Sequence, residues 1–244
     1  MSEAKLEWNN RCKEHPFRYI LGRKVDEVEF DKSGEPEAIE LLSNLPPALN
    51  EWVVCDVGCG VGRLEKLISN KFKEVHGVDV SEEMVEKGRD RLKGYSNVFL
   101  QQSDGKGLAM FRDCMFNLVF SVGVFQHVPR NIVFNNYFKE VYRVLKPGGY
   151  FKFTVPSRRI LFSKPKHLFK ALIFGYLREK RRFIFSAPEG EPLDNDFFST
   201  RFFSRGEIER SLKRAGFDVL TINRKVLLDD GQIWITSRRL ANAT

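Results

Sequence analysis

Cysteine is scarce in this sequence. Four cysteines occur among 244 residues, and no two of them have the C-x-x-C spacing that is typical of zinc sites and redox motifs. Cys12, Cys55, Cys59 and Cys114 lie among apolar or glycine-rich neighbours, which favours small core side chains in a reducing compartment. We therefore expect neither a metal site nor a disulfide framework.

Long hydrophobic runs are also missing. No stretch approaches the roughly 20 apolar residues that a membrane-spanning helix needs. The first residues, MSEAKLEWNN, are acidic and polar where a secretory signal would be apolar. These features predict a cytoplasmic protein, and 244 residues of which 42% are hydrophobic suffice for one α/β domain with additions.

Acidic residues are outnumbered, and the excess of positive charge is uneven. Lys and Arg total 40 against 32 Asp and Glu, which gives a net charge of +8. Residues 157–182 carry a single acid, Glu179, among a cluster of cations: Arg158, Arg159, Lys164, Lys166, Lys170, Arg178, Lys180, Arg181 and Arg182. Such a field attracts anions, although a solvated basic face would look the same.

Apolar segments typical of strands alternate with segments of helical periodicity along most of the chain. The expected strands are residues 52–56, 74–80, 98–102, 116–122, 150–155, 218–222 and 232–236. The expected helices are residues 63–69, 81–92, 131–144 and 204–216, with Ser81 and Ser204 as N-caps. This alternation predicts an α/β fold with a mostly parallel, seven-stranded sheet flanked by helices.

The same pattern predicts a single domain over residues 1–244 with two additions to its core. Residues 1–50 form an N-terminal helical segment, in which Ser33 caps a helix that ends at Pro46-Pro47. Residues 51–156 form the core and 201–244 complete the sheet. Residues 157–200 lack a clear strand but carry an apolar helical stripe over 167–177, so we interpret them as an insertion that forms a lid together with residues 1–50.

A glycine-rich turn follows the first expected strand. In Asp56-Val-Gly-Cys-Gly-Val-Gly the chain passes from a strand into a helix, so its backbone can approach a ligand at the positive end of that helix. A nicotinamide fingerprint, G-x-G-x-x-G, would place its third glycine at position 63, where Arg63 stands.

The motif D-x-G-x-G-x-G after a hydrophobic strand resembles the first motif of class I S-adenosylmethionine-dependent methyltransferases. The resemblance covers roughly residues 50–156 and implies a Rossmann-like fold, with S-adenosyl-L-methionine as cofactor and S-adenosyl-L-homocysteine as product. By this resemblance Asp56 orients the cofactor's amino group. The turn that holds the methionine portion comprises Gly58, Cys59, Gly60 and Gly62.

Further residues match the family's cofactor site, each at the end of a strand. Asp79 matches the acid that binds the two ribose hydroxyls, a task for which a carboxylate offers paired acceptors. Asp104 matches the acid that receives the adenine amino group. The remaining matches are Val80 and Met84 near the adenine, Ser103 and Gly105 beside Asp104, and Ser121, Val122 and Phe125 below the transferable methyl group.

The acceptor side offers one candidate for catalysis, His127, which follows the fourth strand and could accept a proton from a hydroxyl or amine. His15, His76 and His167 have no such placement and are interpreted as surface or packing residues. Ser121-Val-Gly-Val stands where many methyltransferases of base or amide nitrogens have Asn/Asp-Pro-Pro-Tyr/Phe, and no cysteine follows this strand. Both absences disfavour nucleobase substrates.

Three hypotheses of function follow. We favour methyl transfer to a hydroxyl or amine of a small or medium-sized acceptor, such as a sugar, an anionic compound or a lipid-linked molecule collected through peripheral membrane contact of residues 157–185. The alternative is a methyltransferase of tRNA or another nucleic acid, in which Phe162, Phe169, Phe174 and Phe183 add stacking to the basic segment. A non-catalytic cofactor-binding protein is the third hypothesis, and the oligomeric state is open.

Overall fold

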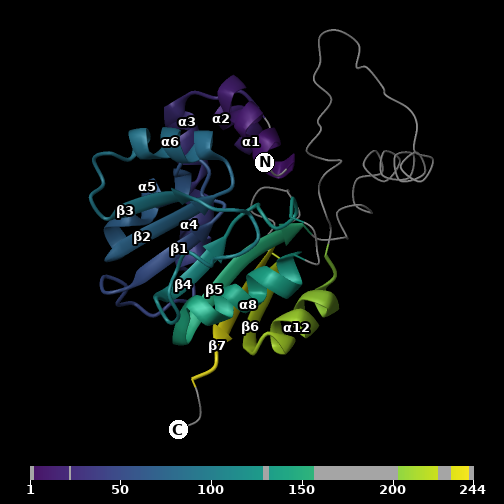
Figure 1. Ribbon diagram of the computed structural model, residues 1–244. Helices are drawn as coiled ribbons and strands as arrows, with labels where there is room; N and C mark the ends of the chain where they lie inside the picture. The colour runs from purple at the N-terminus through teal and green to yellow at the C-terminus, as the bar shows by residue number, and fades with distance from the viewer. Residues whose placement is uncertain (1–2, 22, 129–131, 157–202, 225–231, 242–244) are drawn as a thin grey trace, which may run out of the picture.

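The computed structural model describes residues 3–21, 23–128, 132–156, 203–224 and 232–241. Their centre is a seven-stranded sheet of order β3-β2-β1-β4-β5-β7-β6 (Figure 1). The strands are β1 (Val53–Val57), β2 (Glu74–Asp79), β3 (Val98–Gln102), β4 (Phe116–Ser121), β5 (Leu145–Pro156), β6 (Phe217–Arg224) and β7 (Gln232–Arg239). The predicted fold class is confirmed, since all seven strands expected along the chain occur and join one mostly parallel sheet.

Six of the seven strands run in the same direction, and β7, the last in sequence, runs against its neighbours. β1 lies between β2 and β4 in parallel register, with Val54 opposite both Val75 and Leu118. β7 inserts antiparallel between β5 and β6. β1 is buried from Val54 to Val57, as expected of a strand covered on both faces. The parallel strands therefore end at one edge of the sheet, where α/β folds bind their ligands.

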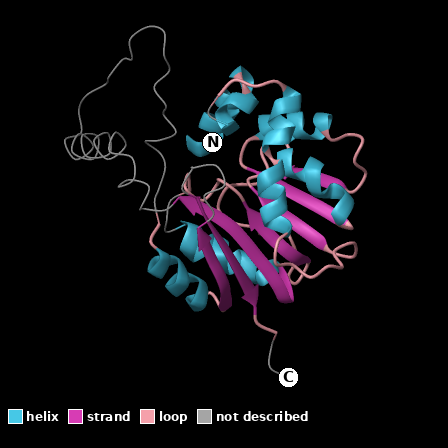
Figure 2. Ribbon diagram, turned by 180° about the vertical axis from the view of Figure 1, so that it is seen from behind, coloured by secondary structure: helices cyan, strands magenta, loops and turns pink. Residues whose placement is uncertain are grey.

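Helices cover both faces of the sheet (Figure 2). Apolar side chains of α4 (Glu35–Leu42) and α5 (Arg63–Ile68) pack against one face, on β1 and β4. The other face packs against α8 (Phe138–Val144) and α12 (Arg205–Arg214) through an aromatic core that includes Phe125, Phe138 and Phe151. The further helices are α1 (Glu3–Glu14), α2 (Pro16–Leu21), α3 (Glu27–Ser33), α6 (Glu82–Arg91) and the short turns η1 (Ser69–Lys71) and η2 (Val133–Tyr137).

The N-terminal helices lie over the edge at which the parallel strands end (Figure 1). Helix α1 packs along α6, where Lys5 pairs with Glu82 and Lys13 pairs with Glu83, both at 3.1 Å. The amine of Lys87 on α6 also donates to the carbonyl of Cys12 at 2.6 Å. The described residues up to Leu42 form four helices, as expected of a helical N-terminal segment, and the first of them is bound to the helix that follows β2.

Two local predictions were wrong. Ser33 does not cap a helix: it is the last residue of α3, and Gly34 takes the N-cap position of α4 because Pro36 favours an early position in the second helix. The strand expected over 150–155 begins earlier than predicted: β5 starts at Leu145 and bulges beside Phe116 before regular pairing resumes at Tyr150.

The capped helices were predicted correctly. Ser81 accepts from the amide of Met84 at the start of α6, and Ser204 and Glu207 form a capping box on α12. The expected lid insertion at 157–200, with its helix at 167–177, lies outside the described residues. Within the described part of the chain, no helix combines the length and the apolar content that crossing a lipid bilayer requires.

Candidate active site

The glycine turn after β1 brings three backbone positions into left-handed conformations. Gly58, Gly60 and Gly62 have φ angles of +89°, +54° and +79°. A Cβ atom on Gly58 would lie 2.2 Å from Val124, and one on Gly62 would lie 2.4 Å from Leu92. At Gly60 the nearest atom would be Cδ1 of Ile20, at 3.4 Å. Gly58 and Gly62 thus pack against protein, whereas Gly60 leaves room on the outer side of the turn.

Asp79 connects this turn to the end of β2. Its Oδ2 accepts a hydrogen bond of 2.9 Å from the amide of Gly60, and its Oδ1 accepts one of 2.9 Å from the amide of Ser81. Burial raises the pKa of Asp79, and these backbone donors lower it again in part. Each oxygen retains acceptor capacity on the partly exposed side of the residue, as recognition of a vicinal diol requires.

Asp56 lies below the turn, in the interior. The residue is 3% exposed, and its Oδ1 has no hydrogen-bond partner among the described residues. Burial, together with the nearby carboxylate of Glu65, raises the pKa of Asp56 well above its usual range. A buried acceptor without a donor fits a binding partner that brings its own N–H groups.

The loop after β3 completes the edge. The amide of Ser103 donates to the carbonyl of Asp79 at 2.8 Å, and Gly105, with φ +74°, lies close to Val80. Asp104 is exposed, and its Oδ1 accepts from the amide of Lys106 at 2.8 Å. The predicted adenine-side residues therefore lie beside the predicted ribose-binding acid.

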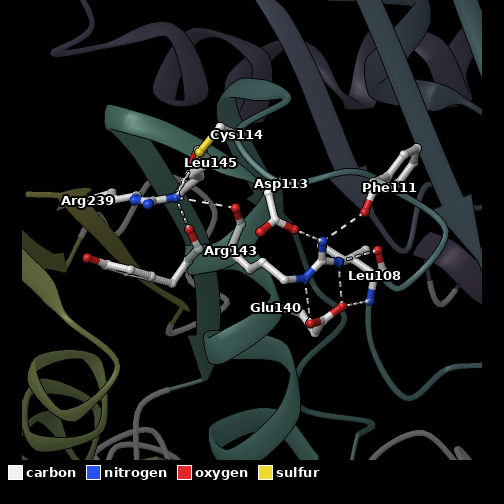
Figure 3. Close-up of polar contacts among 9 residues, drawn as sticks. Leu108, Phe111, Asp113, Cys114, Glu140, Arg143, Leu145 and Arg239 are labelled. Carbon is white, nitrogen blue, oxygen red and sulfur yellow. Dashed lines mark hydrogen bonds and ion pairs between the residues drawn. The ribbon is translucent and has the colours of Figure 1, made fainter. Parts of the chain in front are cut away.

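This loop is held from behind by Arg143 on α8 (Figure 3). Its guanidinium donates to the carbonyls of Phe111 at 2.9 Å and Leu108 at 3.1 Å, and it pairs with Glu140 and Asp113. Arg239 of β7 donates to main-chain carbonyls at the end of the same helix (Figure 3). The loop that carries Asp104 is thus fixed by side chains from a helix far along the chain.

Several predicted site residues lie in the interior. Met84 packs with Cys12 and Phe30, and Phe125 belongs to the aromatic core. Cys59 is buried against α6, and the hydroxyl of Ser121 donates to the carbonyl of Val57 at 2.8 Å. Val122 is partly buried against the other face of the sheet from Phe125, in the cluster that includes Leu118 and Phe120. These side chains pack in the interior beneath the strand ends.

His127 lies on the loop after β4, partly buried, with its amide donating to the carbonyl of Val124 at 2.8 Å. The indole of Trp8 on α1 meets its imidazole edge to face, with ring centroids 5.5 Å apart. His76, in contrast, is partly buried and stacks against the exposed ring of Phe99, as expected for a surface or packing residue. Of the described histidines, His127 is the one that follows β4 at the edge where the parallel strands end and that contacts helix α1.

The sequence matches known methyltransferases. Residues 54–149 fit the family model described as a methyltransferase domain. The demethylmenaquinone methyltransferase of Staphylococcus aureus (strain MRSA252) is 33% identical over an alignment that covers 48% of this chain and 57% of that protein. The chain therefore spans little more than half the length of this curated relative.

Solved structures share the fold. The magnesium protoporphyrin IX methyltransferase of Synechocystis PCC 6803, determined with S-adenosylhomocysteine, superposes with a TM-score of 0.67 at 17% identity and covers 96% of this chain and 97% of its own. An S-adenosylmethionine-dependent methyltransferase from Mesorhizobium loti gives 0.61 at 17% identity, covering 85% and 98%. Residues 54–149 of this chain thus match a methyltransferase domain, and solved S-adenosylmethionine-dependent methyltransferases share its fold.

Some residues in and around the candidate site were not identified from the sequence. Tyr137, in the π-turn η2, is buried against Phe125, and burial and the charges of Asp104 and Asp79 raise its pKa. Glu65 lies buried beside Asp56. Trp8 and Ile20 approach from the N-terminal helices. An acid among the leucines of helix 63–69 was a signal for Glu65, but the other positions carry no pattern that sequence alone reveals.

Proposed function

We propose that this chain transfers a methyl group from S-adenosyl-L-methionine to a hydroxyl or amine of a small-molecule, sugar or lipid-linked acceptor. The observation that carries the proposal is the hydrogen bond between Gly60 and Asp79, which joins the glycine turn and the diol-binding acid in one cradle. The family match over residues 54–149 supports it.

The residues fit this cofactor. The space outside Gly60 admits a chain close to the backbone, Asp56 offers a buried acceptor toward an ammonium group, and Asp79 offers acceptors toward ribose hydroxyls. Asp104, Ser103 and Gly105 would hold the adenine side, beside Val80. When bound, the cofactor supplies an electrophilic methyl group on a sulfonium.

The chain's own task is then to orient the acceptor and to exclude water. His127 lies where it could accept the acceptor's proton, and Trp8 covers its ring from α1. The N-terminal helices therefore supply part of the cover that we propose over the acceptor side. A curated relative of this chain is named for demethylmenaquinone, which supports a small-molecule substrate class.

A labelling experiment tests this function. The protein is incubated with tritiated S-adenosylmethionine and fractionated cell extract, with Asp79→Ala as the control that cannot hold the ribose. We expect label in the small-molecule or lipid fraction. Label in RNA would favour the nucleic-acid alternative, and cofactor binding without labelling of any fraction would favour the non-catalytic one.

A further inference from the structure

Two carboxyl groups meet in the interior below the glycine turn. Asp56 is the fourth residue of β1, and Glu65 lies in the first turn of α5. Their exposed fractions are 3% and 0%. Within the described residues, neither Oδ1 of Asp56 nor either oxygen of Glu65 has a hydrogen-bond partner, while the two side chains interact with one another.

Within the part of the chain that the structure describes, Arg63 on α5 is the cation whose charge favours ionisation of both acids. Its guanidinium binds Glu37 of α4 at 2.9 and 3.2 Å, so its charge is shared with a third carboxylate. Asp79 of β2 adds negative charge. Cys55 on β1 and Cys59 in the turn also face the pair, and burial raises the pKa of both thiols, so both remain uncharged.

Two ionised carboxylates cannot remain together in such surroundings, because each would be desolvated, unpaired and repelled by the other. One proton held between them removes one charge and supplies the missing donor. In line with this, burial raises the pKa of Glu65 to about 7 and that of Asp56 well above its usual range.

Asp56 also borders the cofactor site, since it stands two residues before Gly58. We propose that the Asp56–Glu65 pair holds one proton before the cofactor binds and releases it when the cofactor's ammonium group takes its place beside Asp56. The inference rests on the proposed function. On binding, the carboxyl O–H bond breaks, the proton passes to solvent, and an ammonium N–H becomes the new donor to Asp56. Glu65 is buried completely and acts through Asp56, as a positioning residue.

Two ligands separate this event from other proton transfers. S-adenosylhomocysteine carries the ammonium group, whereas 5′-methylthioadenosine has the same adenine and ribose without the amino-acid portion. Both ligands engage Asp79, so any proton that Asp79 exchanges appears with both. The difference in proton release between the two ligands reports on the Asp56–Glu65 pair.

The experiment is calorimetry of both ligands in phosphate and imidazole, buffers of unlike ionisation enthalpy. At a pH of about 6, we expect S-adenosylhomocysteine to release about one proton more than 5′-methylthioadenosine, and its affinity to rise up to about tenfold per pH unit below about pH 7. In Glu65→Gln, whose amide can still donate to Asp56, this difference and this pH dependence should be clearly reduced. The affinity for 5′-methylthioadenosine should stay within about twofold.

Equal proton release with both ligands in the wild-type protein would overturn the inference, and this comparison does not depend on any variant folding. A full difference retained in Glu65→Gln would overturn it as well. If neither ligand bound to the folded wild-type protein, the proposed function itself would fail and this inference with it.

Discussion

The amide of Gly60 donates a hydrogen bond of 2.9 Å to Oδ2 of Asp79, and this bond joins two segments that are 19 residues apart in the sequence. The glycine turn follows β1 and Asp79 ends β2, so the parallel pairing of these strands sets the relative position of the two. One carboxylate thus orients the turn, and it is also the acid that we propose to bind the ribose hydroxyls.

Removal of this carboxylate tests the cofactor site most directly. We expect Asp79→Ala to weaken binding of S-adenosylhomocysteine by about 1.5–3 kcal/mol, the range for hydrogen bonds that involve a charged group. Calorimetry measures the affinity, and circular dichroism checks that the variant is folded. Phe99→Ala, on the exposed side of β3, is the control. Unchanged affinity in folded Asp79→Ala would mean that the ribose is held elsewhere.

The second prediction concerns the space outside Gly60. Gly60→Val should abolish cofactor binding, because a β-branched side chain would occupy that space and Gly60 has φ +54°. Gly148 also has a left-handed conformation, φ +77°, at the opposite end of the sheet. Gly148→Val therefore controls for backbone strain and should retain binding. Wild-type affinity in Gly60→Val would remove the turn from the site.

The third prediction concerns stability and pH. Glu65 has its pKa raised from 4.5 to about 7, so the folded protein keeps a proton that the unfolded chain has already released. The free energy of unfolding should therefore fall as pH rises through this interval, by up to about 1.4 kcal/mol per pH unit for one proton, and should level off above it. Urea unfolding across the interval measures this slope.

Glu65→Gln is the matched variant for that measurement. Because glutamine does not titrate, the slope that Glu65 contributes should be lost, and the variant should gain stability relative to wild type as pH rises. Asp56 and Asp79 also have raised pKa values and contribute slopes of the same sign, so the decrease will be reduced rather than eliminated. A parallel pH profile in both proteins would count against an elevated pKa at Glu65.

The fourth prediction concerns the side chain that holds the loop after β3. Arg143→Lys keeps the charge but cannot donate at once to the carbonyls of Leu108 and Phe111. We expect a loss of about 1–3 kcal/mol in the free energy of unfolding, the cost of leaving such groups without partners. Arg214→Lys on the exposed face of α12 should change it little. Equal effects of the two substitutions would contradict a special role of Arg143.

The fifth prediction separates catalysis from packing at His127. If its imidazole accepts the acceptor's proton, His127→Gln should lower kcat by about a hundredfold or more, and the affinity for S-adenosylhomocysteine should stay near wild type. Trp8→Phe keeps an aromatic ring against His127 and should retain most of the activity. A small effect of His127→Gln on kcat would leave the histidine as a packing partner of Trp8.

Most of the strands and helices were accessible from the sequence. The placement of the glycine turn, Asp79 and Ser103–Gly105 at one edge of the sheet was predictable, because each lies at the end of a strand and the carboxyl ends of parallel strands meet at one edge. Their contacts with the cofactor stay a prediction. The caps at Ser81 and Ser204 were predicted because capping depends on residues within one turn. The start of α4 was predicted wrongly, because Ser33 and Gly34 both suit a helix boundary.

Only the tertiary structure decided which distant residues meet. The pairing of Asp56 with Glu65, the contact of Trp8 with His127 and the clamp of Arg143 on the loop after β3 each join separate elements. Such contacts depend on how helices dock on the sheet, and no local periodicity or motif encodes that docking. The sequence by itself therefore determined the alternation of strands and helices along the chain and which acids and glycines stand at the ends of the strands. The proposed shared proton of Asp56 and Glu65 depends on burial, and the proposed cover over the acceptor side depends on how the N-terminal helices dock, so both needed the tertiary structure.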